Sequence, residues 1–420
     1  MTARTLGSGP TRWGRLRVPF HRASSATLAG AYPFLAPPPS TLGTPVGVDA
    51  LTGEAFCFDP WALYAAGVLT NPNVALAGVI GSGKSALAKS LAVRAIAAGR
   101  RAYVPGDPKG EWAVVAEQVG GSVLRLGPGL PARLNPLDAT AGGQSSARVV
   151  AAITETLLAR PLAAGERAAL DAAVRGRNLM IGQVVAALID PDPALAREDG
   201  VALAERAGDG RDVAHALRRL TRGDLAGMFD GPCTVRLDPS APMVVVDLSA
   251  LGSDDTAVTI AMTCASAWLE AALADHDTGT GRWVIYDEAW RLLRSPALVR
   301  RMQAQWKLAR AHGIANLLVL HRLSDLDAVG DAGSEARALA AGLLADCSTR
   351  VMYRQETDQL TSTHLALGLT DTERSLLPSL PRGCGLWTLP GSSRLIHHRL
   401  HADELAVYDT DLAMRGGAGC

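Results

Sequence analysis

Lysine, paired cysteines and long apolar runs are all scarce in this chain of 420 residues. Lysine occurs only at Lys84, Lys89, Lys109 and Lys307, so arginine carries nearly all of the basic charge. Together with the abundance of alanine, this bias is typical of GC-rich coding, and the arginine content therefore has little functional meaning. It makes Lys84 and Lys109 more informative, because arginine does not replace lysine at a phosphate site.

The six cysteines are isolated, with no C-x-x-C pair among Cys57, Cys233, Cys264, Cys347, Cys384 and Cys420. This spacing argues against a zinc site and a disulfide scaffold, and it favours a reducing cytosol. No apolar run reaches the roughly 18–20 residues that span a bilayer, and the basic N-terminus has no signal-peptide core behind it. We expect a cytoplasmic protein without its own membrane span, which reaches the inner face of the membrane only through a partner.

Neither sign of charge is in excess, because 41 basic and 41 acidic residues give a formal net charge of zero. The chain therefore has no global basic field that would attract nucleic acid. This argues only weakly against DNA, since a ring-shaped motor can bind DNA with a few local charges in its pore. The length and the 48% content of hydrophobic residues allow two to three domains with a large core.

The stretch Gly78–Ser85 reads GVIGSGKS and follows the apolar run Val74–Ala77. A helix is predicted directly after it, over Ala86–Ala98, so the pattern is strand, glycine-rich loop and helix, as in a phosphate loop. Glycines let phosphate oxygens approach the backbone, and the N–H groups of the loop and helix start point at them. The residues predicted to bind nucleotide are Gly78, Gly81, Ser82, Gly83, Lys84, Ser85 and Ala86, with Asp107 from the next strand.

Within this loop, Lys84 is predicted to place its charge on the β- and γ-phosphates of ATP, and Ser85 to ligate Mg²⁺. The strand that follows the first helix, Arg101–Val104, leads into Asp107–Glu111, which reads DPKGE. Acidic residues at that point lie at the carboxyl edge of a parallel sheet, where ligands bind.

Strands alternate with helices over most of the remaining chain, which predicts an α/β fold with a mostly parallel sheet. Apolar residues at helical spacing, without a strand-like run, predict an all-helical insertion between two parts of this core. The expected organisation is a flexible N-terminal arm (1–44), a first part of the core (45–145), the helical insertion (146–231), a second part of the core (232–400) and a C-terminal tail (401–420). Arg211, Arg218, Arg219 and Arg222 cluster in the insertion, and we favour a solvated helix face over a DNA contact.

Two apolar strands end in aspartate, Val244–Asp247 and Trp283–Asp287, and only the second is followed by glutamate. We expect Asp287 to hold Mg²⁺ through its water shell, and Glu288 to polarise the attacking water and accept its proton. Consecutive residues at a strand end can direct one carboxylate to the metal and the next to the γ-phosphate. Asp247 is interpreted as the end of a neighbouring strand.

Two further catalytic residues are predicted with alternatives open. His321 ends the next strand, where it either senses the γ-phosphate or is a structural histidine. Arg310 is the first candidate for an arginine supplied across a subunit interface to stabilise the transition state. Arg350 and Arg354 are the alternatives for that arginine.

These motifs together resemble those of the HerA–FtsK superfamily of ring ATPases, in particular the TraC-like motors of conjugation and type IV secretion. The resembling segments are Asn71–Ser85, Asp107–Glu111, Leu134–Leu137, Leu225–Gly231, Val244–Ser249, Trp283–Leu293 (WVIYDEAWRLL) and Arg310–Gly313. The resemblance covers about residues 46–400. It implies a RecA-like core with the helical insertion, a hexameric ring, and ATP and Mg²⁺ bound between subunits.

The resemblance implies an ATPase that powers transfer or assembly in a conjugative secretion apparatus, with channel or inner-membrane proteins as partners. Two alternatives remain open. One is a DNA-translocating motor of the coupling-protein or HerA type, whose hydrolysis would be stimulated by duplex DNA. The other is a nucleotide-gated assembly subunit that binds ATP and hydrolyses it negligibly.

Overall fold

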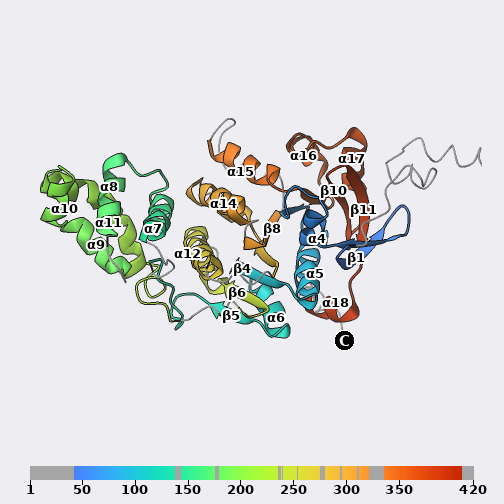
Figure 1. Ribbon diagram of the computed structural model, residues 1–420, viewed down its shortest axis with the longest axis horizontal. Coiled ribbons are helices and arrows are strands. Elements are labelled where there is room, and N and C mark those ends of the chain that lie inside the picture. The colour runs from blue at the N-terminus through green and yellow to red at the C-terminus, as the bar shows by residue number, and fades with distance from the viewer. Residues whose placement is uncertain are drawn as a thin grey trace, which may run out of the picture. The chain divides into compact units, whose positions relative to one another are not determined.

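The computed structural model describes residues 42–137, 143–175, 179–234, 238, 240–252, 254–274, 280–293, 296–309, 312–320 and 335–408. The chain forms two compact units (Figure 1). Of the described residues, the first unit holds those within 1–98, 317–327 and 344–420, and the second holds those within 99–316 and 328–343. No helix in the described ranges is long and apolar enough to cross a bilayer.

The first unit is built on a mixed sheet in the order β2-β1-β11-β10-β9-β3-β8. Its strands are β1 (Thr44–Asp49), β2 (Ala55–Phe58), β3 (Val74–Ala77), β9 (Thr349–Met352), β10 (Cys384–Leu389), β11 (Ser392–His398) and the later part of β8 (Ile314–Leu320). β3 pairs in parallel with both β8 and β9, and all four of its residues are buried. A short, fully apolar strand of this kind is typical of the centre of a sheet.

The helices of the first unit are α4 (Pro60–Ala65), α5 (Lys84–Ala97), α16 (Leu360–Leu367), α17 (Asp371–Leu376) and α18 (Ala402–Tyr408), with short 3₁₀ turns at Thr357–Gln359 and Leu377–Ser379. Arg94 of α5 ties α18 to the unit, because its guanidinium lies 2.6 Å from Glu404. Phe56 and Phe58 pack edge-on against Trp387, with ring centroids 5.1 and 5.2 Å apart, respectively. These aromatic contacts join β2 to β10 in the core.

The second unit contains a parallel sheet in the order β7-β4-β6-β5. Its strands are β4 (Arg101–Asp107), β5 (Ser122–Arg125), β6 (Met243–Asp247) and β7 (Arg282–Tyr286). β6 and β7 are buried along their whole length. Because all four strands are parallel, the residues that follow their carboxyl ends meet at one edge of the sheet.

Helices occupy the rest of the second unit. They are α6 (Glu111–Gln118), α12 (Asp255–Ala274), α13 (Trp290–Leu293), α14 (Pro296–Ala309) and α15 (Glu335–Ala345, through Leu343), with a 3₁₀ turn at Ser249–Leu251. Between β5 and β6 the described residues form helices and no strand: α7 (Gly143–Leu158), α8 (Ala164–Ala173), α9 (Ile181–Ile189), α10 (Pro193–Glu198) and α11 (Leu203–Arg222). Gly210 lets α11 approach α9 closely, since a Cβ there would lie 2.6 Å from the carbonyl oxygen of Leu188.

The predicted α/β class, the mostly parallel sheet and the helical insertion are confirmed. The first predicted helix begins two residues earlier than expected, at Lys84. The helices that the sequence did not predict include α4, α6, α13 and α18. α6 begins at Glu111, the last residue of DPKGE, and α18 lies in the stretch that was predicted to be a C-terminal tail.

Candidate functional site

The phosphate loop connects β3 to α5 and depends on glycine for its path. Gly81 and Gly83 have φ angles of +76° and +108°, in the left-handed region that favours glycine. Gly83 is also the N-cap of α5, and the first helical hydrogen bond runs from Leu87 N to Gly83 O. The N–H groups of Lys84, Ser85 and Ala86 therefore precede the helical ladder and point out of the helix start.

Two polar side chains of the loop, those of Lys84 and Ser82, turn inward. Lys84 is buried, and its Nζ donates hydrogen bonds to the carbonyl oxygens of Gly78 and Val79, at 2.5 and 2.9 Å. Ser82 Oγ donates to the same carbonyl of Val79, at 2.7 Å. Ser85, one residue into α5, is partly exposed. The loop thus carries a buried ammonium, leading helix amides and an accessible hydroxyl within eight residues, which is the donor set for a polyphosphate with its metal.

Two distant segments of the first unit support the loop. Val79 N donates to Arg354 O, and Gly383 N donates to Ser82 O, both at 2.9 Å. A Cβ at Gly78 would lie 2.5 Å from the Cβ of Tyr353, so glycine is required there by close packing. Neither Tyr353 nor Gly383 was predicted, because a contact between segments this far apart in sequence leaves no local pattern.

The second unit brings acidic residues together at the carboxyl edge of its sheet. Asp107 and Asp247 are in register at the ends of β4 and β6, and Asp287 follows β7. All three are buried. Among the described residues, no three or more His, Cys, Asp or Glu side chains are grouped as ligands of a metal ion. A cation at this edge would therefore need further ligands, as Mg²⁺ does when it keeps waters and substrate oxygens.

Asp287 is oriented by a tryptophan. Trp112 Nε1 donates to Asp287 Oδ2 at 2.9 Å, and the backbone N–H of Glu288 donates to Asp287 Oδ1 at 3.0 Å. Burial raises the pKa of Asp287 above its usual value, against the hydrogen bond from Trp112, and the charge of Glu288 adds to the rise. Trp112 was not predicted as a site residue. Its only sequence signal is its position directly after DPKGE.

Glu288 is held by its backbone conformation and by a lysine. Its φ is +55°, which is uncommon for a residue with a side chain. Its carboxylate is almost fully buried and forms an ion pair with Lys109 Nζ. Burial alone would lower the pKa of Lys109. The hydrogen bond and charge of Glu288, with Glu111 and Asp287 nearby, raise it instead, so Lys109 stays protonated.

Asp107, predicted to bind nucleotide, is engaged in the fold itself. Its Oδ2 accepts from the backbone N–H groups of Trp112 and Ala113, and its Oδ1 accepts from that of Glu111, at 2.7–3.2 Å. The carboxylate therefore caps the start of α6. Burial raises the pKa of Asp107 to about 6, opposed by these backbone hydrogen bonds, with the charges of Asp247 and Asp287 adding to the rise.

Asp247 lies at the edge as the end of β6. Its Oδ1 accepts from Ser249 N at 2.9 Å, and its Oδ2 lies 3.6 Å from Arg125 Nε. These contacts fit the interpretation of Asp247 as the end of a neighbouring strand. Its carboxylate stabilises the turn after β6 and pairs with an arginine of β5.

Known structures share this architecture. VirB4 of Thermoanaerobacter pseudethanolicus superposes with a TM-score of 0.72 at 19% identity, over 87% of this chain and 99% of VirB4. The chain shares its fold with VirB4. The bacterial conjugative coupling protein TrwBdeltaN70 also matches, with a TM-score of 0.60 at 15% identity, over 86% of this chain and 89% of that one. No protein-family model and no curated protein sequence matches the chain.

The fold shared with VirB4 and TrwB agrees with the fold that the sequence resemblance implied. Two predicted catalytic residues, Arg310 and His321, lie outside the described residues. Of the alternative arginines, Arg350 donates from Nη1 to the carbonyl oxygen of Leu367 at 3.1 Å. Arg354 has an exposed side chain, while its backbone carbonyl supports the phosphate loop. Arg354 is therefore the better placed of the two to reach a neighbouring molecule.

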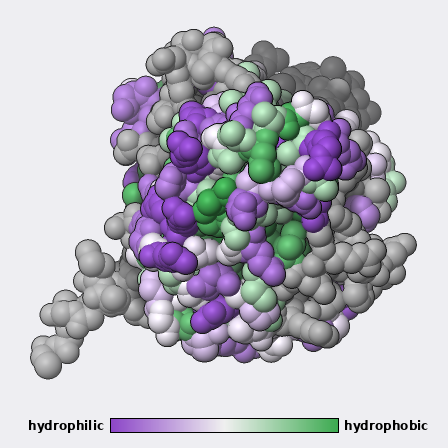
Figure 2. Space-filling view, turned by 90° about the vertical axis from the view of Figure 1, so that its left-hand side faces the viewer, coloured by the Kyte–Doolittle hydropathy of each residue, from purple (hydrophilic) through white to green (hydrophobic). Residues whose placement is uncertain are grey.

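Two of the four clustered arginines of the insertion have neighbours within the insertion itself. Arg219 pairs with Asp224 at 2.7 Å, and Arg218 contacts His215. Figure 2, which looks onto the left-hand side of Figure 1, shows hydrophilic residues interspersed with small apolar patches. A polar surface of this kind fits the favoured interpretation of a solvated helix face.

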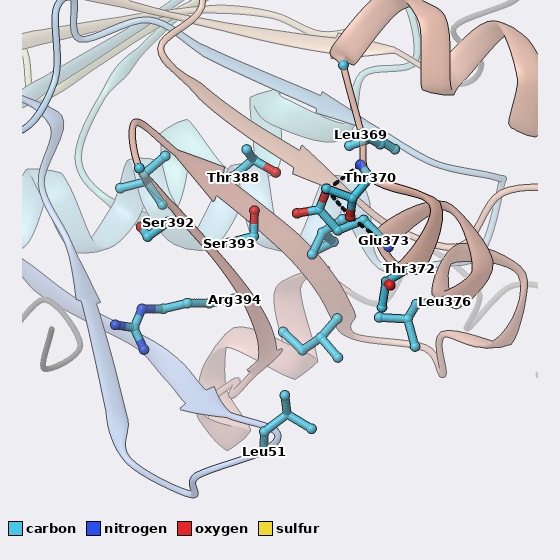
Figure 3. Close-up of a pocket in the computed structure, with 15 residues that line it drawn as sticks. Leu51, Leu369, Thr370, Thr372, Glu373, Leu376, Thr388, Ser392, Ser393 and Arg394 are labelled. Carbon is cyan, nitrogen blue, oxygen red and sulfur yellow. Dashed lines mark hydrogen bonds between the residues drawn. The ribbon is translucent and has the colours of Figure 1, made fainter. Parts of the chain in front are cut away.

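A cavity of about 530 Å³ lies elsewhere in the VirB4-like first unit, between the β10–β11 hairpin and the α16–α17 segment (Figure 3). Thr388 and Ser393 line it from the hairpin, and Thr370 and Glu373, which are hydrogen-bonded to each other, line it from α17. No residue predicted to bind nucleotide or metal is in its lining. This cavity is therefore separate from the phosphate loop.

Proposed function

We propose that this chain is an ATP-hydrolysing motor of a conjugative type IV secretion system. The observation that carries the proposal is the phosphate loop, in which glycine turns, Lys84 and the amides of α5 form a cradle for a polyphosphate. The likeness to VirB4 and TrwB supports it, and TrwB structures hold an ATP analogue, or ADP with Mg²⁺. The proposal assigns ATP and Mg²⁺ to this chain.

In this proposal the loop binds the phosphates of ATP. The amides of Gly81, Gly83 and the helix start donate to phosphate oxygens, and the ammonium of Lys84 exchanges its carbonyl partners for the β- and γ-phosphates. Exchange is favourable because a phosphate oxygen carries more charge than a carbonyl oxygen. The role of the remaining loop residues, Gly78 and Ser82, is to hold the backbone path.

Ser85 and Asp287 are the residues that would hold Mg²⁺. A partly exposed hydroxyl and a buried, oriented carboxylate are hard oxygen ligands of the kind that Mg²⁺ prefers. When bound, the ion neutralises charge that develops between the β- and γ-phosphates.

Glu288 accepts the proton of the attacking water. The water oxygen bonds to the γ-phosphorus, the bond from that phosphorus to the bridging oxygen breaks, and the bridging oxygen leaves on ADP with the electron pair. The carboxylate of Glu288 takes the proton released by the water. We propose that Arg310 stabilises the transition state across a subunit interface and that His321 senses the γ-phosphate.

We further propose that the chain works as a hexameric ring at the cytoplasmic face of the inner membrane, with channel or inner-membrane proteins as partners. An arginine supplied in trans requires a neighbouring subunit, so hydrolysis should depend on assembly. The specific activity of ATP hydrolysis should therefore rise with protein concentration. Sedimentation with an ATP analogue that shows only monomer would count against the ring.

The decisive test is ATP hydrolysis by the wild type and by Glu288→Gln. We expect the variant to bind a nonhydrolysable ATP analogue normally while its turnover falls by about 10²–10³-fold, the contribution of a general base. Glu205→Gln, at an exposed position of α11, is the matched control and should retain wild-type turnover. Equal background phosphate release from wild type and Glu288→Gln would instead support a nucleotide-gated assembly subunit.

A second candidate function is a DNA-translocating motor, which the match to the coupling protein TrwB favours. Duplex DNA would then stimulate hydrolysis strongly, and the stimulation would fall steeply with salt, because phosphate contacts release counterions. Hydrolysis that is indifferent to DNA at low salt would favour the secretion motor.

A further inference from the structure

The turn between β4 and α6 places a lysine against the proposed general base. Lys109 belongs to that turn, and Glu288 follows β7, the strand beside β4. Their side chains form an ion pair within the second unit. We propose that Lys109 is a positioning residue for hydrolysis, and that its ammonium holds the Glu288 carboxylate in the orientation from which it accepts the proton of water. The inference rests on the proposed function, in which Glu288 is that base.

The backbone conformation of Glu288 sets the direction in which its side chain leaves the main chain, and it does not set the orientation of the carboxylate. At φ +55° the residue is in the left-handed region, which costs a residue with a Cβ roughly 1–2 kcal/mol. Such a conformation persists only where the surroundings determine it. Here the Glu288 N–H donates to Asp287 Oδ1 at 3.0 Å, which ties the turn to the strand end. The orientation of the carboxylate itself depends on the groups that it contacts further along the side chain, and Lys109 is one of them.

Lys109 is suited to orient this carboxylate. The Glu288 side chain is 6% exposed, whereas that of Lys109 is 51% exposed, so the lysine reaches from solvent over a buried carboxylate. A buried carboxylate without a partner is strongly unfavourable. An ammonium is a compact charge with three donors, so it can orient one carboxylate oxygen without imposing a bidentate geometry.

Hydrogen bonds and a glycine turn define the main chain on either side of Lys109. Asp107 caps α6 with both carboxylate oxygens, and its carbonyl accepts from Leu248 N at 3.0 Å. Gly110, with φ +71°, turns the chain into α6. Because the turn is held by these hydrogen bonds, Lys109 loses less conformational entropy when it pairs with Glu288. A contact that is supported in this way can keep a catalytic side chain in its productive orientation.

The expected decrease in kcat can be estimated from the contribution that a correctly oriented general base makes to the rate. A positioned general base contributes about 10²–10⁴-fold to a rate. Without Lys109 the carboxylate remains present and loses only its orientation. We therefore expect about a 10- to 100-fold decrease in kcat when the ammonium is removed, which is smaller than or equal to the loss from removing the base.

The experiment is steady-state ATP hydrolysis by the full chain carrying Lys109→Met, which keeps the length of the side chain and removes its charge. We expect kcat to fall about 10- to 100-fold, with KM for ATP and the affinity for a nonhydrolysable ATP analogue unchanged. Lys109→Arg should restore most of kcat, because it can pair with Glu288. Lys307→Met, at an exposed position of α14, is the matched control and should behave as wild type.

The double variant Lys109→Met with Glu288→Gln should hydrolyse ATP no more slowly than Glu288→Gln alone, since both changes act on one group. A wild-type or raised kcat in Lys109→Met, an effect on KM instead of kcat, or additive losses in the double variant would each overturn the inference. Should Lys109→Met not fold, Lys109→Gln carries the same expectation. If Glu288→Gln leaves turnover unchanged, the proposed function fails rather than the role of Lys109.

Discussion

The phosphate loop and the acidic edge are built in opposite ways. In the loop, backbone groups do the positioning: Val79 N, Gly383 N and the carbonyls that accept from Lys84 define its shape. At the acidic edge, side chains position other side chains, with Trp112 on Asp287 and Lys109 on Glu288. Substitutions that add atoms should therefore disturb the loop most. At the acidic edge, the loss of a single hydrogen-bond donor should have the larger effect.

The largest effect is expected from Lys84→Ala in the loop. Removing the buried ammonium of the loop should abolish tight binding of ATP, and hydrolysis should fall by at least about 100-fold, because the β- and γ-phosphates lose their charged partner. Binding of a fluorescent ATP analogue and phosphate release measure the two effects. Lys307→Ala is the control. Unchanged affinity and turnover in Lys84→Ala would show that the loop does not bind phosphate.

Two glycine substitutions separate crowding from backbone strain in the loop. Gly78→Ala would bring a Cβ within 2.5 Å of the Tyr353 Cβ, and overpacking of this kind costs roughly 1–3 kcal/mol. Gly81→Ala meets no atom within 4 Å, and its strain comes only from φ +76°, about 1 kcal/mol. Denaturant unfolding of each variant should therefore show the larger loss for Gly78→Ala. Equal losses would mean that Tyr353 moves aside without cost.

The same contrast explains what could be predicted from sequence. β3 was predicted at its observed bounds, Val74–Ala77, because a short apolar run before a glycine-rich loop is a local pattern. α6 was missed because it is short and follows Pro108 and Gly110, which indicate a turn, and because its cap is Asp107 at the end of β4. With α6 missed, the partner of Asp287 was missed too.

At Asp107 the motif and the observed hydrogen bonds indicate different roles. Its place at a sheet edge predicts contact with a ligand, yet both of its oxygens accept from the start of α6. The sequence of DPKGE does not distinguish a carboxylate that faces a ligand from one that caps a helix. The observed hydrogen bonds show that Asp107 caps α6, and its contact with nucleotide stays a prediction.

At the acidic edge, Trp112→Phe tests the loss of one donor with little change in shape. Phenylalanine cannot donate to Asp287, and a buried charged acceptor that loses its partner costs about 1–3 kcal/mol. We expect the Mg²⁺ concentration for half-maximal hydrolysis to rise several-fold. Trp306→Phe is the matched control, because Trp306 Nε1 is buried and has no hydrogen-bond partner among the described residues. Equal Mg²⁺ dependence in both variants would remove Trp112 from the site.

The smallest expected effect is a difference between the two units in how their free energy of unfolding depends on pH. In the first unit, burial lowers the pKa of His398 to about 4, with Arg94 adding to the decrease and Glu404 opposing it. The unfolded chain then binds more protons than the folded one between about pH 4 and 6.5, so stability rises with pH across this window. In the second unit the raised pKa of Asp107, about 6, gives the opposite slope between about pH 4 and 6.

Acidification from pH 7 to pH 6 should therefore destabilise the first unit by about 0.7 kcal/mol through His398. Hydrogen exchange followed by mass spectrometry, corrected for intrinsic rates, resolves peptides of β10–β11 from those of β4–α6. His398→Gln should flatten the pH dependence of the first unit, whereas His401→Gln, at an exposed position, should leave it unchanged. A slope that persists in His398→Gln would assign the acid sensitivity of this unit to another group, and the contrast with Asp107 would then lose its physical basis.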